Sequence, residues 1–414
     1  MQEHGSDTTS PSGAVSGRGA RASGLRRANL AAVLRHVHLH GGTSRSDLTS
    51  AIGLNRSTIG ALVGELVDLG LVDEVGGTAS SGPGRPSPVV HPRPRGAQVL
   101  AIELAADAAS VATVGIGGAI LERATVPHDP GKDAPGDLVA DLAEAARPLL
   151  TALPAGKLLS VGAAVVGVTR RSDGFVHLAP NLGWRDVPLA DLLRTALAPH
   201  LARPVPVHVA NEADLGALAE HSRGAGRGVD HLVFVSGEIG IGVGAISDGR
   251  PLLGAAGYAG EAGHTLIDPN GLRCGCGARG CWETAAGQTA LLREAGLDPH
   301  APGEVAIPEF LARARAGDPA ALGAAAHVGR WLGIGVGNLV NLLNPSLVVL
   351  GGLYRQTFSL IEDAMREGLA TRVLDPPGQL LRVVPSTLGG SAPLVGAAEL
   401  AFGDLLSDPG LHVG

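Results

Sequence analysis

All three cysteines of this 414-residue chain lie within eight positions, Cys274 to Cys281, and a histidine precedes them by ten residues. The set is Cys274, Cys276 and Cys281 with His264. Three thiolates and one imidazole match the tetrahedral preference of Zn²⁺, and the intervening glycines let a short loop fold back on itself. The spacing therefore predicts a zinc site with four protein ligands and no open coordination position, which is typical of a structural metal.

Two alternatives to zinc exist. The thiols could be ordinary small apolar residues, but their clustering argues against that. A disulfide with a spare thiol fits poorly, because the sequence shows no secretory signal and no apolar run that could span a membrane. We therefore expect a soluble cytoplasmic protein with reduced cysteines.

Carboxylates flank this cluster in a way that zinc alone does not explain. Glu261 and Glu283 lie on either side of it, and a second polar group, Asn211-Glu212-Ala213-Asp214, follows a predicted strand over residues 205–209. Ligand sites of α/β proteins form at the carboxyl ends of such strands. An alternative interpretation is that Asn211 merely caps the helix that follows.

The N-terminal part of the chain predicts a DNA-binding domain. After a tail over residues 1–24, predicted to be disordered, a first helix begins near Asn29, a capping box at Ser44 opens a second helix and Asn55 caps a third. The third helix has apolar residues on one side and a small, polar surface near its start, as in a helix-turn-helix. The predicted DNA contacts on this helix are Asn55, Arg56, Ser57 and Thr58.

A predicted wing follows these helices. Residues 71–75 are strand-like, and the segment 82–90 carries Arg85 and Pro86 at its tip, where a guanidinium can enter a narrow minor groove. Residues 1–95 carry a net charge of +3 and the remainder −10, a weak indication of nucleic acid binding at the N-terminal end. Three short helices alone would equally fit a small bundle or a protein-binding module, whereas the wing favours a winged helix-turn-helix over residues 25–90.

The rest of the chain predicts an α/β body. A proline-rich linker at 91–96 leads into strands near 98–105, 110–116 and 120–126, a helix near 137–153 and a buried strand near 159–168. Further strands are expected near 231–236, 241–246, 347–350 and 380–385. We divide the body into a first lobe, 97–220, a second lobe with the zinc loop, 221–390, and a C-terminal helix, 391–414, that returns to the first lobe.

The combined motifs resemble the ROK family of repressors, open reading frames and sugar kinases. They are Glu261-x-Gly-His264, Cys274-x-Cys-Gly-x-x-Gly-Cys281-x-Glu283, Asn338-Leu-Val-Asn341-Leu-Leu-Asn-Pro345 with Leu350-Gly-Gly352, and Asn211-x-x-Asp214. The resemblance covers residues 25 to about 405 and, with the winged helix, points to the repressor branch. It implies a two-lobed actin-like, ribonuclease-H-like sugar kinase fold with a sugar cleft between the lobes.

The resemblance also implies the sugar contacts. Carried over to this chain, they are Asn211, Glu212, Glu261, His264 and Glu283. Carboxylates and amides are suitable partners for hydroxyls, which both donate and accept hydrogen bonds. His264 would serve zinc through one ring nitrogen and the sugar through the other.

Two departures from the kinase pattern argue against catalysis. The family's Asp-x-Gly-Gly-Thr phosphate loop corresponds to residues 103–107, Glu-Leu-Ala-Ala-Asp, and its Gly-Thr-Gly loop to Glu238-Ile239-Gly240. Both changes lose a hydroxyl and add an acid where phosphate would bind. The expected catalytic aspartate is Glu212, whose longer side chain would misplace a base.

The sequence therefore predicts a sugar-responsive transcriptional repressor without enzyme activity, which binds an inverted-repeat operator as a homodimer or dimer of dimers. Two other functions remain open at this point. One is an ATP-dependent sugar kinase with a DNA-binding head, and the other is a regulator controlled by protein contact instead of sugar.

Overall fold

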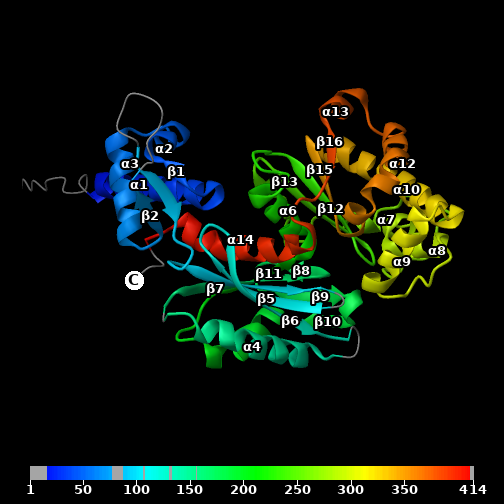
Figure 1. The fold of residues 1–414 in the computed structure, drawn as a ribbon, viewed down its shortest axis with the longest axis horizontal. Coiled ribbons are helices and arrows are strands. Elements are labelled where there is room, and N and C mark those ends of the chain that lie inside the picture. Colours follow the sequence, from blue (N-terminus) through cyan, green and yellow to red (C-terminus); the bar gives the residue numbers. More distant parts are fainter. Residues whose placement is uncertain (1–15, 77–86, 106–107, 130–132, 155, 411–414) are drawn as a thin grey trace, which may run out of the picture. The chain divides into compact units, whose positions relative to one another are not determined.

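The computed structural model describes residues 16–76, 87–105, 108–129, 133–154 and 156–410 (Figure 1). The chain divides into two compact units, Met1–Ala97 with Phe402–Gly414, and Gln98–Ala401. We call the first unit the head and the second the body. In the described part of the chain, we find no helix with the length and apolar character needed to cross a membrane.

The head contains three helices and a small sheet. The helices are α1 (Ser16–His40), α2 (Arg45–Ile52) and α3 (Arg56–Asp68), and the strands are β1 (Thr43–Ser44), β2 (Val72–Val75) and β3 (Val89–Pro92). The strands pair antiparallel in the order β1-β3-β2. The predicted DNA contacts Arg85 and Pro86 belong to the segment between β2 and β3. Both residues lie outside the described residues. Three helices and a paired strand are the elements that the predicted winged helix-turn-helix requires.

Local capping explains where the head's helices begin and end. Ser44 Oγ accepts a hydrogen bond from the backbone N–H of Asp47 at 3.1 Å, and Asn55 Oδ1 accepts one from Thr58 N–H at 2.9 Å. Gly53 ends α2 with a φ of 74°, the left-handed conformation that favours glycine. These are the caps predicted from the sequence.

Two predicted boundaries in the head differ from the structure. Helix α1 starts at Ser16, within the segment predicted to be a disordered tail, because the weakly patterned residues before Asn29 extend the same helix. His91 and Pro92 belong to β3 instead of a linker, since His91 pairs with Asp73 and Pro92 with Val72. Proline is accommodated because β1 pairs with Val89 and Val90 and does not reach Pro92, which therefore lies at an edge of the sheet.

The end of helix α14 (Ala392–Ser407) belongs to the head. Phe402 packs edge-on against His38 with ring centroids 5.0 Å apart, and Arg35 donates to the carbonyl of Leu406 at 3.4 Å. Asp408, just after the helix, pairs with Arg27 at 3.2 Å. The sequence predicted a return of this helix to the first lobe, and did not anticipate that its last turns complete the core of the head.

The first lobe of the body is built on a mixed sheet with the order β11-β7-β4-β5-β6. Its strands are β4 (Gln98–Leu104), β5 (Ala108–Gly115), β6 (Ala119–Pro127), β7 (Leu158–Val165) and β11 (Val207–Asn211). Side chains of β7 alternate between two faces. Val161, Ala163 and Val165 join the core beneath α4 (Pro135–Thr151) and α5 (Leu189–Leu197), while Ser160 Oγ donates to the Ala401 carbonyl in α14 at 2.6 Å.

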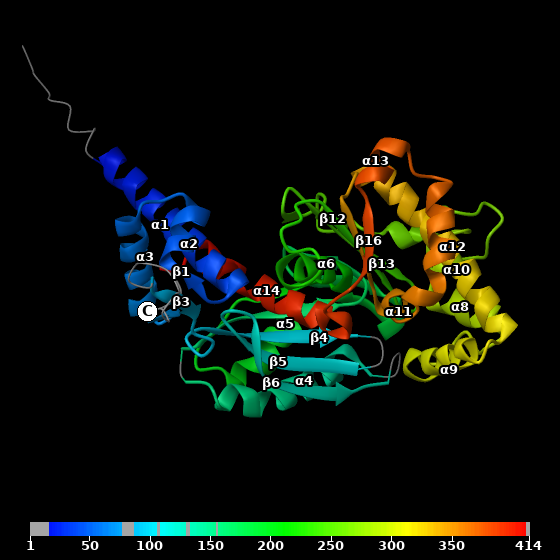
Figure 2. The same ribbon diagram turned by 45° about the horizontal axis from the view of Figure 1, so that its top comes forward.

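Helix α14 therefore covers the sheet face opposite α4, as Figures 1 and 2 show. A second small sheet, which the sequence did not predict, extends this lobe in the order β10-β9-β8. Its strands are β8 (Val168–Arg170), β9 (Phe175–Ala179) and β10 (Trp184–Val187), with the short 3-10 helix η1 (Pro180–Leu182) between the last two. The short 3-10 helix η2 (Ala198–His200) follows α5.

The second lobe repeats the same sheet plan in the order β14-β13-β12-β15-β16. Its strands are β12 (Leu232–Gly237), β13 (Ile241–Ser247), β14 (Arg250–Pro251), β15 (Leu347–Gly351) and β16 (Arg382–Pro385). In each lobe three antiparallel strands are followed by two parallel ones. The repeated plan matches the predicted two-lobed fold.

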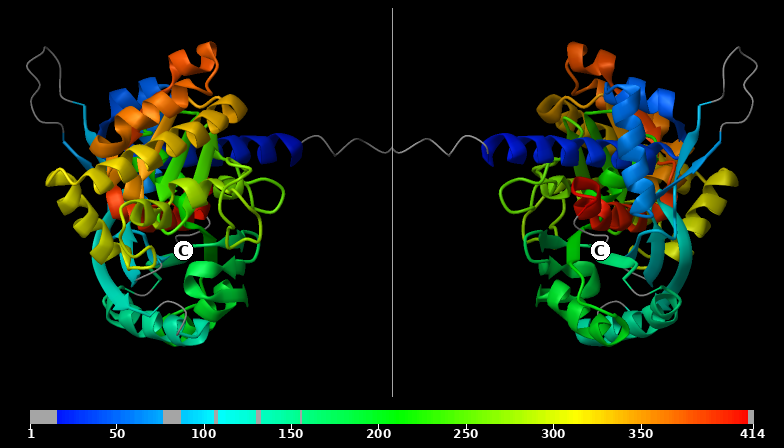
Figure 3. Two further views of the ribbon diagram at one scale, coloured as in Figure 1. Left: turned by 90° about the vertical axis from the view of Figure 1, so that its right-hand side faces the viewer. Right: turned by 90° about the vertical axis from the view of Figure 1, so that its left-hand side faces the viewer.

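Helices cover both faces of the second sheet. One core lies beneath α6 (Glu212–Arg223), and the other lies beneath a group of helices that stands in front of the sheet in the left view of Figure 3. This group comprises α7 (Trp282–Ala286), α8 (Gln288–Glu294), α9 (Gly303–Arg315), α10 (Pro319–Leu343) and α12 (Phe358–Ala370). The remaining short elements are η3 (Ala262–His264), α11 (Gly352–Gln356), α13 (Asp375–Leu380) and η4 (Gly389–Ser391).

Candidate functional site

The predicted zinc ligands converge on one point of the second lobe. His264 ends η3, Cys281 caps the start of α7, and the intervening loop is held by backbone bridges between Leu266 and Cys281 and between Arg273 and Arg279. Gly280 has a φ of 75°, and a Cβ there would collide with the backbone of Asp268. This position therefore requires glycine, as the sequence suggested for the loop.

The separations of the ligand atoms fit a zinc ion. Cys276 Sγ and Cys281 Sγ lie 3.7 Å apart, Cys274 Sγ and His264 Nδ1 lie 3.6 Å apart, and all four ligand atoms lie within 4.8 Å of one another. A tetrahedral zinc with its usual bond lengths places two sulfurs about 3.8 Å apart and a sulfur and a nitrogen about 3.6 Å apart. The four residues therefore fit the ion, and the sequence grouped them correctly.

The thiols are tuned by their surroundings. The Cys274 thiol donates a hydrogen bond to Glu283 Oε1 at 2.8 Å. Burial and this bond both raise the pKa of Cys274, whereas a hydrogen bond from the backbone of Ala278 lowers the pKa of Cys276. A bound metal opposes the rise at Cys274, because it stabilises the thiolate.

Three of the five predicted sugar contacts lie around this cluster. His264 Nδ1 is 3.4 Å from Glu283 Oε1, and His264 Nε2 is 3.9 Å from Glu261 Oε2. One ring nitrogen therefore faces the cysteines and the other faces Glu261. Burial raises the pKa of Glu261, and His264 partly offsets this rise.

The other two predicted contacts follow β11 and have different surroundings. The Asn211 side chain accepts from Ala213 N–H at 2.7 Å and donates to the Gly167 carbonyl at 2.9 Å, so it caps α6. This is the alternative weighed from the sequence. Glu212, the first residue of α6, instead lines a cavity. Asn211 thereby fixes the helix start that presents Glu212.

The structure adds two charged residues that were not among the predicted contacts. Asp214 is only 7% exposed, and burial raises its pKa to about 7 while Arg171 opposes the rise. The pKa of Arg171 is lowered by burial, and Asp214 raises it. Because Glu261 also raises the pKa of Asp214, the first turn of α6 is electrostatically linked to the carboxylates beside the cysteines. The polar segment after β11 could have predicted Asp214 from the sequence. No sequence pattern pointed to Arg171.

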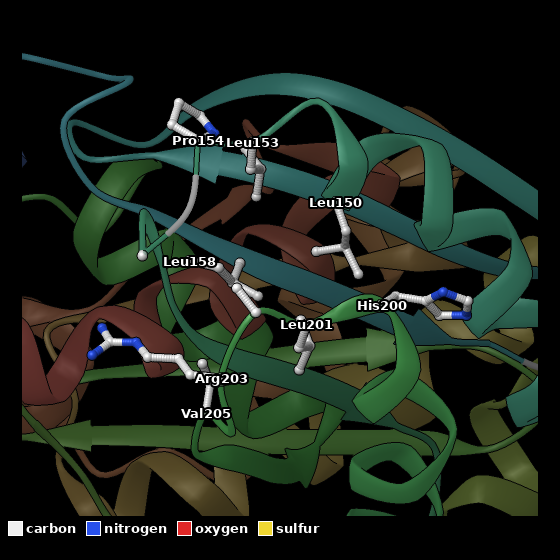
Figure 4. Close-up of a pocket in the computed structure, with 10 residues that line it drawn as sticks. Leu150, Leu153, Pro154, Leu158, His200, Leu201, Arg203 and Val205 are labelled. Carbon is white, nitrogen blue, oxygen red and sulfur yellow. The ribbon is translucent and has the colours of Figure 1, made fainter.

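The cavity beside Glu212 has a volume of about 410 Å³. It is lined by both lobes, with Glu103, Asn181 and Glu212 from the first and Glu238, Gln288 and Gly352 among those from the second. Pockets of this size commonly bind small molecules. A second hollow, shown in Figure 4, measures about 50 Å³ beneath Leu150 and Leu201 and contains none of the predicted site residues.

In the head, the predicted DNA contacts lie at the exposed start of α3. Asn55, Arg56 and Ser57 are exposed and Thr58 is half-buried. Ser57 Oγ donates to Asn55 Oδ1 at 2.7 Å, so the side chain of Asn55 is already engaged in capping. Gly60, further along α3, lies against the guanidinium of Arg45, which would be 3.2 Å from an added Cβ.

Comparison with known proteins places this two-lobed fold and its cysteine loop in one class. Residues 99–403 match the ROK family, and the chain belongs to that family. The xylose repressor of Bacillus subtilis is 29% identical over 383 residues, covering 92% of this chain and 97% of its own length. The resemblance predicted from the motifs is thereby confirmed.

Two solved structures show the same relationship. A ROK family transcriptional regulator, a homologue of the E. coli MLC protein, has a TM-score of 0.74 and 27% identity, covering 93% of this chain and 96% of its own. A ROK family glucokinase from Streptomyces griseus in complex with glucose and AMPPNP has a TM-score of 0.63 and 28% identity, covering 73% of this chain and 99% of its own. The regulator extends over the head as well as the body, whereas the glucokinase covers less of this chain.

Proposed function

We propose that the protein is a sugar-responsive transcriptional repressor that binds operator DNA through the head and a sugar through the body. The observation that carries the proposal is the presence, in one chain, of a head with three helices and a small antiparallel sheet, and of a carboxylate cluster beside a group of one histidine and three cysteines. The similarity to a xylose repressor and to a ROK transcriptional regulator over more than nine-tenths of the chain supports it.

The sugar would be held between α6 and the cysteine loop. Glu212, Glu261 and Glu283 accept hydrogen bonds from hydroxyls, and Nε2 of His264 offers a further partner. Asp214, with a pKa of about 7, adds a carboxyl that can donate or accept near neutral pH. Asn211 acts through its cap, by setting where Glu212 lies.

Zinc would be held by His264, Cys274, Cys276 and Cys281, as predicted. A bound zinc ion would cross-link the loop. It would offer no open coordination position for a reaction, because protein ligands would fill all four positions of a tetrahedral ion. The ligand set fixes the imidazole whose other nitrogen faces Glu261. The loop would therefore position His264 and Glu283 for the sugar.

Phosphoryl transfer is disfavoured by the surroundings of the second loop. The carboxylate of Glu238 lies against Gly352, whose φ is +52°, and Ser236 Oγ lies 2.9 Å from where a Cβ of Gly352 would be. A carboxylate beside this turn repels the phosphate that the kinase relatives bind. In the first loop Glu103 lines the same cavity, while Asp107 lies outside the described residues. We therefore propose that the protein is not an enzyme.

DNA would be bound by a homodimer or a dimer of dimers on an inverted repeat, with α3 in the major groove. A sugar that binds one arrangement of the two lobes more tightly than another shifts the population toward the tighter-binding arrangement. The size of the shift is limited by the difference in affinity between the two arrangements. Release of the operator would follow if the favoured arrangement binds DNA less well. Such a protein would act in the cytoplasm, as the sequence predicted.

Mobility-shift titration of the full-length, zinc-loaded protein tests this function, with duplexes selected from a random library. We expect a defined inverted repeat, release by a sugar, and about tenfold weaker binding for Arg56→Ala, since a specific arginine contact contributes roughly 1–3 kcal/mol. Arg147→Ala, an exposed site in the first lobe, is the matched control for lost charge and should bind like the wild type.

The two alternatives have separate tests. Robust ADP release with any member of a sugar panel would establish a kinase and contradict the proposal. The absence of binding heat with every sugar and sugar phosphate, together with intact DNA binding, would favour control by protein contact.

A further inference from the structure

The cavity beside Glu212 is largely separate from the proposed sugar contacts. Of those five residues, Glu212 is among the lining residues of the 410 Å³ cavity, and Asn211, Glu261, His264 and Glu283 are not. A single sugar ring held by Glu261, His264 and Glu283 would therefore leave most of this cavity free. Glu212 is the one proposed sugar contact among the residues that line the cavity.

The chemistry of the cavity suits an uncharged polar ligand with apolar faces. Among its described lining residues are three carboxylates and no lysine or arginine. Further hydrogen-bonding groups come from Asn181, Ser236, Gln288 and Thr289. Apolar walls come from Val166, Phe234, Ile239, Pro299, Pro302 and Pro393. Sugar rings present hydroxyls at their edges and C–H groups on their faces, which match such a mixture.

The same lining opposes a nucleotide. Glu238 lies against the turn at Gly352, so its carboxylate occupies the surroundings in which a phosphate would meet backbone amides. Glu103 and Glu212 add negative charge to the same space. The related glucokinase binds glucose and AMPPNP together, whereas here the charge of the second space favours a different occupant.

One wall of the cavity is held rigidly. Gly389 and Gly390 line it, and the turn before them is fixed by Glu220, which is fully buried. Glu220 Oε1 accepts hydrogen bonds from Ser386 Oγ at 2.5 Å and from Leu388 N–H at 3.2 Å. A Cβ added at Gly390 would meet no atom within 4 Å. Residue 390 therefore has room for a larger side chain at this wall of the cavity.

We propose that the cavity is a second ligand subsite, which takes the second ring of an uncharged glycoside whose first ring lies against Glu261, His264 and Glu283. The natural effector is then a disaccharide or larger glycoside, and Glu212 contacts the link between its rings. This inference rests on the proposed sugar response. It names the chemical class of the effector that the body distinguishes.

Isothermal titration calorimetry with the full-length, zinc-loaded protein tests the inference. The probes are glucose, xylose, cellobiose, maltose, xylobiose and AMPPNP. We expect at least one disaccharide to bind tenfold or more tightly than its own monosaccharide, and AMPPNP to give no heat. Gly390→Phe should abolish the advantage of the disaccharide while changing monosaccharide affinity less than twofold.

Two further variants keep the test decisive. Ile239→Trp fills the cavity from the other lobe and should act like Gly390→Phe, so misfolding of one variant leaves the other as the measurement. Gly323→Phe adds the same bulk on exposed α10, where an added Cβ meets nothing within 4 Å, and should bind all probes like the wild type.

The outcomes separate the two proposals. Equal affinity for monosaccharides and all disaccharides, or AMPPNP binding that Gly390→Phe removes, would overturn the second subsite and leave the sugar response standing. Failure of every sugar to bind would instead refute the proposed function, and the subsite with it.

Discussion

The cysteine loop and the cavity beside Glu212 are adjacent parts of the body that are assembled in opposite ways. All four proposed metal ligands come from the short stretch between His264 and Cys281. The cavity is lined by segments scattered from Glu103 to Pro393. Gly240, which follows the lining residues Glu238 and Ile239, lies against Glu283. A locally encoded loop thus fixes the chemistry of one side, while the packing of two lobes shapes the other.

Because the ligands of the cysteine loop lie close together in the chain, we expect loss of one cysteine to remove both metal binding and sugar binding by the loop. Cys276→Ser should lose zinc, because a serine hydroxyl is a poor replacement for a thiolate ligand, and sugar binding should be lost with it. Metal content measured by mass spectrometry and sugar affinity measured by calorimetry check both effects. Gly275→Ala, next to it and with open space at the added Cβ, is the control that should keep the metal. Full zinc content in Cys276→Ser would remove the assignment.

The next largest effect is expected at Glu261. Glu261→Gln removes a charged acceptor beside His264 without changing its size, and should weaken sugar binding about a hundredfold, as loss of a charge-assisted hydrogen bond costs roughly 1.5–3 kcal/mol. The variant should then stay on its operator when sugar is added. Metal content should be unchanged, which separates this effect from that of the loop. Normal release by sugar would show that Glu261 is not a contact.

Asp214, in the first turn of α6, is electrostatically linked to Glu261 and should make the stability of the protein depend on pH. Its pKa is raised from 3.8 to about 7 in the folded protein, so the folded state binds its proton more tightly and stability is lost as the pH rises toward 7. Asp214→Asn should match the wild type only below about pH 4, and its advantage in stability should grow by roughly 2–3 kcal/mol between pH 5 and pH 8. Urea unfolding at both pH values measures this. A variant that is equally destabilised at each pH would contradict the assignment.

The smallest effect is expected at the wall of the cavity. Ser386→Ala removes one hydrogen bond to the buried carboxylate of Glu220 and should lower the free energy of unfolding by about 1–3 kcal/mol. Because the other donors to Glu220 remain, monosaccharide binding should be retained. Thr387→Ala, whose hydroxyl is at 3.4 Å, is the weaker comparison. A larger loss for Thr387→Ala than for Ser386→Ala would contradict this account of the turn.

The same contrast explains what the sequence could and could not predict. The caps at Ser44 and Asn55, the individual strands of the two sheets and the cysteine loop depend on residues close together in the chain, so the sequence could predict them. The small sheet β8–β10 was missed because Trp184 and Asp186 lie in a stretch without strong alternation. Arg171 and the cavity depend on contacts between distant segments, which no local pattern encodes. Glu212 was predicted on both grounds, by its place after a strand and by resemblance.

The head draws its core from segments that precede and follow the body in the chain, and this order has a consequence for biosynthesis. Phe402 and Leu406, which contact α1 residues, are translated after the whole body. Domains usually fold in order as the ribosome extends the chain, but this head can be completed only when the last helix emerges. A ribosome that stalls before α14 would therefore release a chain whose head lacks part of its core.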